Sequence, residues 1–322
     1  MDPTPMECAK STPRSPRLST GFVKSRHRGL GAALVLLAIG FAAAPGCSRS
    51  SDGAGAKIAL EADAAAKLAV TAHWDPITWF SVNANERFPN YFVYKTAVPE
   101  REYSGAEFAA FLPEERVAAG EIWPLDMERV LPFWRQFDPS ATQKLHHGRT
   151  GEGAYAALRA YDDAAAEIVF RTHGEYSLNQ GRVAYVPGQL SGRLLLDRRS
   201  GAVTYFNMFL PTDRSPNVVT DFNYEMEVEK NGKKELGRVF DADIVFVPRM
   251  ELVGGATERP PDDTTWKVRV DGAALRREIQ ALFYESDRIE WLNVDEAALR
   301  SKESGKPIHL IAMFGVLDDE SC

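Results

Sequence analysis

The residues best suited to chemistry in this sequence stand together at the end of the printed chain. Ser321 and Cys322 follow three acidic residues, Asp318, Asp319 and Glu320. A cysteine reacts as its thiolate, which a helix N-terminus or a nearby cation favours and neighbouring carboxylates disfavour. Cys322 is therefore a candidate redox residue. The alternative is an inert cysteine beside a solvated acidic loop.

A buried strand is predicted to lead to Cys322. Residues Ile308 to Leu317 form a continuous apolar run behind a Gly-Lys-Pro turn signal, a pattern typical of such a strand. Two helices are predicted before it, at Gly272 to Tyr284 and at Asn293 to Lys302. These elements would have to position the cysteine.

Composition limits the classes of function. The chain has 322 residues and a net charge of −7, and its length suits one large domain or two ordinary ones. Its basic residues form no continuous patch outside the N-terminus, so we expect no nucleic-acid partner. The three cysteines, Cys8, Cys47 and Cys322, are too few for a disulfide framework.

Residues 1–46 are predicted to be a signal peptide or N-terminal anchor. Basic residues precede the apolar run Gly29 to Ala44, which has the length of a signal segment and is short for a membrane-spanning helix. The following Ala-Pro-Gly-Cys47 resembles a bacterial lipobox, although its alanine and proline depart from the usual residues. We expect lipidation at Cys47 and an extracytoplasmic, membrane-anchored protein. An uncleaved anchor is the alternative.

Residues 47–150 are predicted to divide into a tether and a mixed region. Residues 47–56 are rich in small residues, and 57–150 combine helical and aromatic-rich stretches. Alanine content predicts a helix at Lys57 to His73. A Ser/Glu capping box predicts a short helix at Ser104 to Leu112, and a further helix is expected at Met127 to Phe137.

Residues 151–253 are predicted to form a mainly antiparallel β-rich domain. Asn231-Gly232 between two strand-like runs predicts a hairpin. The same stretch imitates a calcium-binding loop, but Arg238 stands where a bidentate glutamate is needed, so we predict no EF-hand. The strands are expected at Ala166–Leu178, Arg182–Val186, Gly192–Asp197, Val203–Leu210, Phe222–Glu229 and Val239–Met250.

The histidines do not form a metal-binding pattern. His146-His147 has no third ligand at the required spacing and no cysteine pair nearby, so we expect no metal site. Strand alternation puts His173 beside Arg171 and Glu175, where a hydrogen-bonded structural histidine is expected. Ion pairs on the sheet face are expected for Arg159, Arg171, Arg193 and Arg249.

Several segments, in order along the chain, resemble selenoprotein N. The terminal one matches through Phe314-Gly315, Leu317-Asp318-Asp319 and Ser321-Cys322, and the resemblance covers roughly Tyr155 to Cys322. The earlier segments are Phe170–Tyr176, Pro187–Leu196, Met208–Val218 and Asp243–Leu252.

The resemblance implies both a fold and a function. In that family the Ser-Cys pair precedes a selenocysteine, whose codon UGA is normally read as stop, so we expect the printed chain to end at a selenocysteine codon. The fold class is α+β: a mainly antiparallel β domain with flanking helices, followed over 267–322 by the incomplete start of a thioredoxin-like α/β domain.

The implied function is that of a thiol/selenol oxidoreductase in the bacterial envelope. Cys322, with Ser321 as its motif neighbour, would act beside the selenocysteine on a disulfide-bearing protein or a small thiol, with no other cofactor. The chain as printed is expected to be inactive as a reductase. The alternative is a non-catalytic β-rich surface lipoprotein that binds a ligand or partner.

Overall fold

The computed structural model describes residues 55–81, 94–143, 153–213, 216–230, 232–256, 266–283 and 291–310. Several predicted features lie outside these residues: the signal segment with Cys47, the His146-His147 pair, residues 311–317 of the predicted terminal strand, and Ser321-Cys322.

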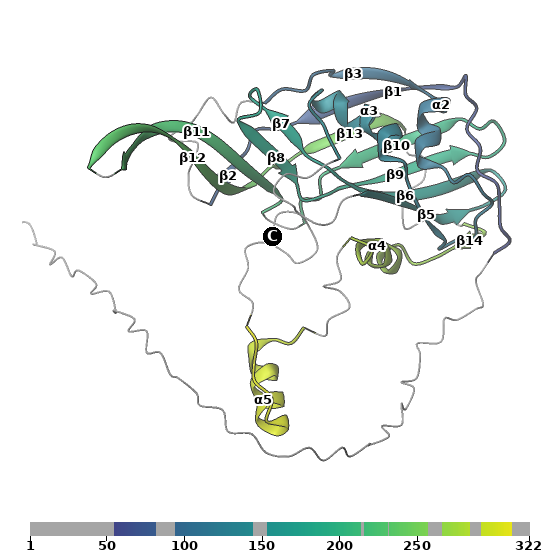
Figure 1. Cartoon of the computed structure of the whole chain (residues 1–322). Coiled ribbons are helices and arrows are strands. Elements are labelled where there is room, and N and C mark those ends of the chain that lie inside the picture. The colour runs from purple at the N-terminus through teal and green to yellow at the C-terminus, as the bar shows by residue number, and fades with distance from the viewer. Residues whose placement is uncertain are drawn as a thin grey trace, which may run out of the picture. The chain divides into compact units, whose positions relative to one another are not determined.

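Most of the described strands form one antiparallel sheet, which we call the large sheet (Figure 1). A short strand, β4 (Ile122–Pro124), pairs with β5 beside the main path. The order along that path is β14 (Val268–Arg269), β5 (Gly153–Tyr161), β6 (Ala165–His173), β9 (Leu190–Asp197), β10 (Val203–Phe209), β13 (Met250–Gly255), β1 (Lys67–Trp74) and β3 (Glu100–Ser104).

The remaining described strands form the small sheet, which is also antiparallel. Its strands β11 and β12 pair residue for residue from Val218↔Val245 to Lys230↔Lys233, so the hairpin predicted around Asn231-Gly232 is confirmed. The order is β2 (Trp79–Phe80), β12 (Lys233–Phe246), β11 (Val218–Lys230), β8 (Val183–Pro187) and β7 (Tyr176–Leu178).

The far part of the β11–β12 hairpin extends beyond its neighbours. Among the described strands, β8 pairs with β11 only up to Phe222, and β2 pairs with β12 only at Val245 and Phe246. The rest of the hairpin is a two-stranded extension, visible at the end of the small sheet (Figure 1). We call residues 223–230 and 233–242 the distal ribbon.

Helices cover both faces of the large sheet (Figure 1). On the inner face, α2 (Gly105–Phe108), the 3-10 turn η3 (Ala109–Phe111) and α3 (Met127–Phe137) pack against the core. On the outer face, α4 (Gly272–Gln280) packs on β5 and β6. The predicted α2 capping box between Ser104 and Glu107 is present.

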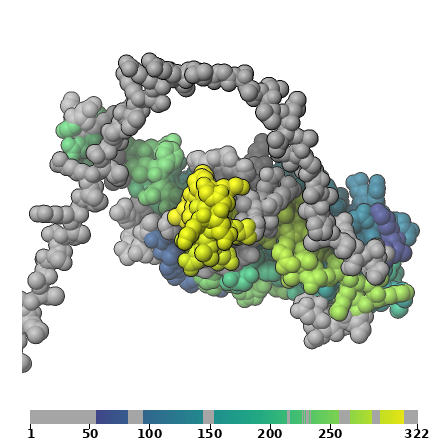
Figure 2. All heavy atoms as spheres, turned by 90° about the horizontal axis from the view of Figure 1, so that it is seen from below, coloured from purple at the N-terminus to yellow at the C-terminus, as the bar shows by residue number. Residues whose placement is uncertain are grey.

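The last described helix is α5 (Val294–Ser304), which begins after the N-cap Asn293 as the sequence predicts. None of its residues is buried, and Figure 2 draws this helix in yellow. Residues 308–310, predicted to begin a buried strand, have no regular structure, and Ile308 and Leu310 are exposed. The described start of that segment therefore differs from the prediction.

The inner face of the large sheet carries the main core because side chains alternate along each strand. In β6, Ile168 and Phe170 join this core while Glu167, Val169 and Arg171 point to the outer face. Phe170 stacks on Phe206 of β10, with ring centroids 5.8 Å apart. The antiparallel, β-rich α+β class predicted from the sequence is confirmed.

The helix predicted at Lys57 to His73 is wrong, because the second half of this stretch is strand β1. Its apolar residues recur with a period of two, and Val70, Ala72 and Trp74 are buried against the core. Burial of this alternating face outweighs the intrinsic helix preference of the alanines, which is a weak term.

The two sheets meet at an aromatic cluster around Trp74. Its indole Nε1 donates a hydrogen bond of 3.1 Å to the Tyr185 hydroxyl of β8, and its ring also contacts Tyr176 of β7. The chain passes from β6 to β7 through Gly174. A Cβ there would lie 2.8 Å from the carbonyl oxygen of Thr142, so the crossing requires glycine.

Candidate functional site

The reactive residues predicted from the sequence cannot be placed in the fold. Cys8, Cys47 and Cys322 all lie outside the described residues, as do Ser321 and His146-His147. Within the described ranges, no group of three or more histidine, cysteine, aspartate or glutamate side chains could hold a metal ion. The polar features that the structure does describe include a buried charge cluster, a histidine clasp and a groove.

The buried charge cluster consists of Arg159, Glu167 and Arg193 on the outer face of the large sheet. Glu167 is 1% exposed. One of its carboxylate oxygens accepts from the Arg193 Nε at 2.6 Å, and the other accepts from the Arg159 guanidinium. The ion pairs expected for these two arginines are confirmed. Buried ions of this kind depend on their partners because they have lost their hydration.

The β-strands bring these three residues together. Arg159 occupies a bulge in β5, where the pairing register with β6 shifts between Leu158 and Ala160. Such a bulge re-aims a side chain, and here it accompanies the ion pair with Glu167. Trp266 packs with Ala160 beside the cluster. These ion pairs thus connect β5, β6 and β9 beside the apolar cluster that contains Trp266.

The histidine clasp links the large sheet to the end of α4. The Arg171 Nε donates to the Nε2 of His173 at 2.7 Å. The His173 ring stacks on Phe283, with centroids 4.0 Å apart and an interplanar angle of 9°. The Arg171 guanidinium also lies 5.0 Å from the centroid of that phenyl ring, a favourable cation–π distance.

The environment keeps His173 neutral. The residue is fully buried, and this burial, together with the charge of Arg171, holds the pKa of His173 well below its ordinary value. Its Nε2 accepts the arginine hydrogen bond and is not available to accept a substrate proton. The expectation of a hydrogen-bonded structural histidine is confirmed. The clasp holds the segment that leads towards residue 322.

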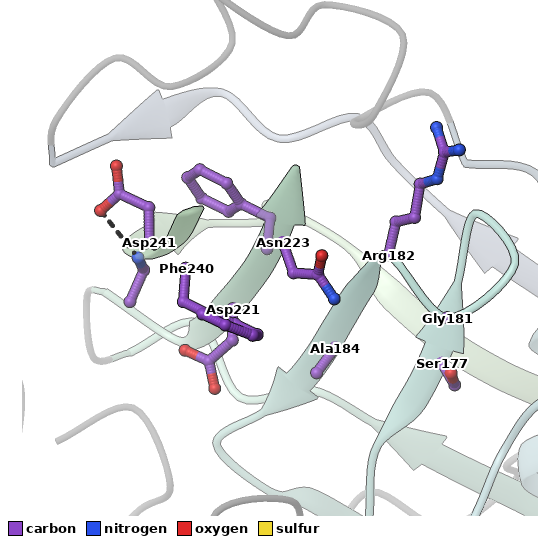
Figure 3. Close-up of a pocket in the computed structure, with 10 residues that line it drawn as sticks. Ser177, Gly181, Arg182, Ala184, Asp221, Asn223, Phe240 and Asp241 are labelled. Atoms are coloured by element: carbon purple, nitrogen blue, oxygen red, sulfur yellow. Dashed lines mark hydrogen bonds between the residues drawn. The ribbon is translucent and has the colours of Figure 1, made fainter. Parts of the chain in front are cut away.

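A groove lies on the small sheet (Figure 3) and was not predicted from the sequence. Its volume is about 680 Å³. Asp221 and Asn223 come from β11, Phe240 from β12, and Arg182 from the turn before β8. These four residues are spread over 59 sequence positions, from Arg182 to Phe240, and share no short motif. No local sequence signal could therefore have identified them. The lining offers charged groups and a phenyl ring for binding. It contains no nucleophile paired with a base.

The remaining predictions can be compared with the described residues. Arg249 pairs with Glu251 at 2.6 Å, as expected for a sheet-face arginine. No described helix combines the length and the apolar character needed to cross a membrane.

The fold and its polar clusters define a β-rich α+β protein, and comparisons with known proteins add a relationship. The chain is similar to selenoprotein N from Danio rerio, with 24% identity over 278 residues, covering 71% of this chain and 48% of that protein. It is also similar to selenoprotein N from Homo sapiens, with 25% identity over 275 residues, covering 70% and 45%. The predicted selenoprotein N-like relationship is confirmed.

The extent of the match corrects one expectation. The chain spans about half the length of the curated relatives it matches. The match nevertheless covers about 70% of this chain, so it must begin before Tyr155, whereas the sequence segments predict a resemblance only from about Tyr155 onward. No family model and no solved structure matches the chain.

Proposed function

We propose that this chain is the scaffold part of a selenoprotein N-like thiol/selenol oxidoreductase of the bacterial envelope. In this proposal Cys322 and an adjoining selenocysteine form the reactive pair, at the start of a thioredoxin-like domain over 267–322. The observation that carries the proposal is the match to selenoprotein N together with Ser321-Cys322 and its acidic approach.

Selenium chemistry supplies the reason for the pairing. Disulfide exchange proceeds by attack of a thiolate, or of its selenium counterpart, on a sulfur atom. A selenol is intrinsically more acidic than a thiol, so it stays ionised beside carboxylates such as Asp318, Asp319 and Glu320. Those carboxylates would raise the pKa of a thiol instead.

The proposed reaction transfers two electrons. The selenolate attacks one sulfur of a substrate disulfide, and the other sulfur leaves as a thiolate that takes up a proton. The Cys322 thiolate then attacks the mixed selenenyl sulfide, which releases the second substrate thiol and leaves a sulfur–selenium bond. A small thiol or protein dithiol would reduce that bond and complete the cycle.

The described fold would act in this reaction as a support. The clasp between His173 and Phe283 fastens the end of α4 to the large sheet, and α4 and α5 lie between that sheet and residue 322 in the chain. The envelope location rests on the signal-like residues 1–46 and on Cys47 as the lipidation site.

The test is a disulfide reductase assay on the protein produced with selenocysteine after Cys322 and with the sequence that follows it. We expect thiol-dependent reduction of a protein disulfide, its loss in Cys322→Ser, and normal activity in the control Cys8→Ser. Equal activity of Cys322→Ser and the unaltered protein would reject the role of Cys322.

A non-catalytic β-rich surface lipoprotein is the second candidate. One observation favours it: the groove on the small sheet (Figure 3) has a lining suited to binding. Absence of reductase activity in the selenocysteine-containing protein would leave this candidate in its place.

A further inference from the structure

Among the described strands, none pairs with the outer edge of β12 along the distal ribbon. At the base of the ribbon, the carbonyl oxygens of Ile244 and Phe246 accept from the amides of Ser81 and Thr78, the residues that flank β2. The backbone N–H and C=O groups of the even-numbered residues of β12 therefore point away from β11, because the direction of these groups alternates along a strand. No described strand pairs with this edge between Lys234 and Ala242.

The exposed edge carries both polar backbone groups and apolar side chains. Leu236 and Phe240 are 71% and 66% exposed, and strand alternation puts them on the same face. The amide of Ala242 is satisfied locally by the Asp241 carboxylate, at 2.9 Å. An unpaired edge with exposed apolar residues is a template for pairing with another strand, and a ribbon of two strands has little stability of its own.

The charge pattern of this edge is complementary to itself. The strand begins with Lys233 and Lys234 and ends its exposed part with Asp241. Antiparallel pairing of two copies sets the basic start of each strand against the acidic end of the other, whereas parallel pairing would set like charges together. Opposite charges across a strand pair are favourable and like charges unfavourable.

We propose that a second copy of this chain pairs with β12 in an antiparallel register centred on Gly237. In this register Lys233 stands opposite Asp241 of the other copy, and Lys234 opposite Phe240. Moving the centre by one residue to Arg238 would place two arginines opposite each other and Glu235 opposite Asp241. The Gly237 register avoids such like-charge pairs.

The register also gathers the exposed apolar residues. Leu236 stands opposite Arg238 of the other copy and diagonal to both Leu236 and Phe240 of that copy. Diagonal neighbours lie within reach of large side chains. Because the same patch serves both copies, the contact is isologous and closes as a dimer. The proposal is independent of any redox function.

The first test is the mass of the full chain in solution, by light scattering across a wide range of concentrations. We expect a species of twice the 35.7 kDa chain mass. Arg238→Pro should abolish it, because proline removes an outward-facing N–H while leaving the β11 ladder intact. The matched control Arg238→Gln keeps that N–H and should still dimerise. Circular dichroism verifies that both variants are folded.

The second test fixes the register by cross-linking in a chain whose three natural cysteines are replaced by serine. Directly opposite residues at a non-hydrogen-bonded position have Cα atoms about 4.5 Å apart, within disulfide range. Gly237→Cys should therefore yield a disulfide-linked dimer on mild oxidation, and the control Glu227→Cys on β11 should not. A wild-type chain that stays monomeric, an Arg238→Pro variant that dimerises, or equal cross-linking of both cysteine variants would overturn the proposal.

Discussion

Glu167 and Arg193 form an ion pair of 2.6 Å on the outer face of the large sheet, and Arg159 holds the other oxygen of the same carboxylate. Replacing Glu167 by Gln leaves two buried guanidiniums without their counter-charge. We expect a loss of about 3–5 kcal/mol in the free energy of unfolding, since breaking a buried pair strands its partner. Urea denaturation measures this loss.

The matched control is the exposed pair between Asp163 and Lys267, at 3.1 Å. Both side chains are largely exposed, so Asp163→Asn should cost less than about 1 kcal/mol. Equal effects of the two substitutions would contradict the account of Glu167 as the buried centre of the cluster.

Stability should fall as the pH drops below the ordinary His pKa of about 6.5. The folded protein holds the pKa of His173 well below that value through burial and the charge of Arg171. At a pH between the two pKa values, the unfolded chain therefore binds a proton at His173 that the folded chain does not bind. Linkage then lowers stability by at most about 1.4 kcal/mol per pH unit, from about 6.5 down to the folded pKa.

Denaturation at a series of pH values tests this dependence. His173→Gln should make the free energy of unfolding depend less steeply on pH just below about 6.5, the unfolded histidine pKa. The reason is that glutamine does not titrate. The control His73→Gln alters a histidine that is only partly buried on β1 and should retain the His173 contribution. An unchanged slope in His173→Gln would exclude His173 as its source.

Gly192 is required by close packing at the centre of the large sheet. A Cβ at this position would lie 2.0 Å from the Phe170 Cζ and 2.6 Å from the carbonyl oxygen of Asn207. Gly192→Ala should therefore lower the free energy of unfolding by about 1–3 kcal/mol through overpacking. Thermal denaturation beside the control Ser191→Ala measures the effect.

A double-mutant cycle separates the side-chain contact from the backbone contact. Phe170→Leu removes the ring that the new methyl group would meet, so the double variant should lose less stability than the two single losses added together. Strict additivity would show that Phe170 is not the group that excludes a side chain at position 192.

Lipidation predicts how the protein partitions in a bacterial host. With intact Cys47, the protein should be found in the membrane fraction and incorporate a labelled fatty acid. Cys47→Ala should remove the label, whereas Cys8→Ala should not. An unlabelled wild-type protein would reject Cys47 as the modified residue.

Local signals predicted many of the described elements. The Ser104/Glu107 capping box, the Asn293 N-cap and the Asn231-Gly232 turn each act within a few residues, and the corresponding helices and hairpin are present. The sequence predicts a helix in place of strand β1 because the alanines there favour a helix locally. The pairing of β1 with β13 and β3 depends on residues distant in the sequence.

The polar clusters were only partly predictable for the same reason. Strand alternation could place arginines on a sheet face, but the partner of Arg193 lies 26 positions away and that of His173 lies on another element. Register and a β-bulge decide those pairings, and neither can be read from a short motif. The groove on the small sheet likewise exists only after β8, β11 and β12 have paired.

The central claim, a thiol/selenol reactive pair at Cys322, is tested most directly by the genomic sequence that follows the Cys322 codon. The account predicts UGA, then a glycine codon and an open reading frame long enough to complete a thioredoxin-like domain. A UAA or UAG codon with no reading frame behind it would contradict the claim.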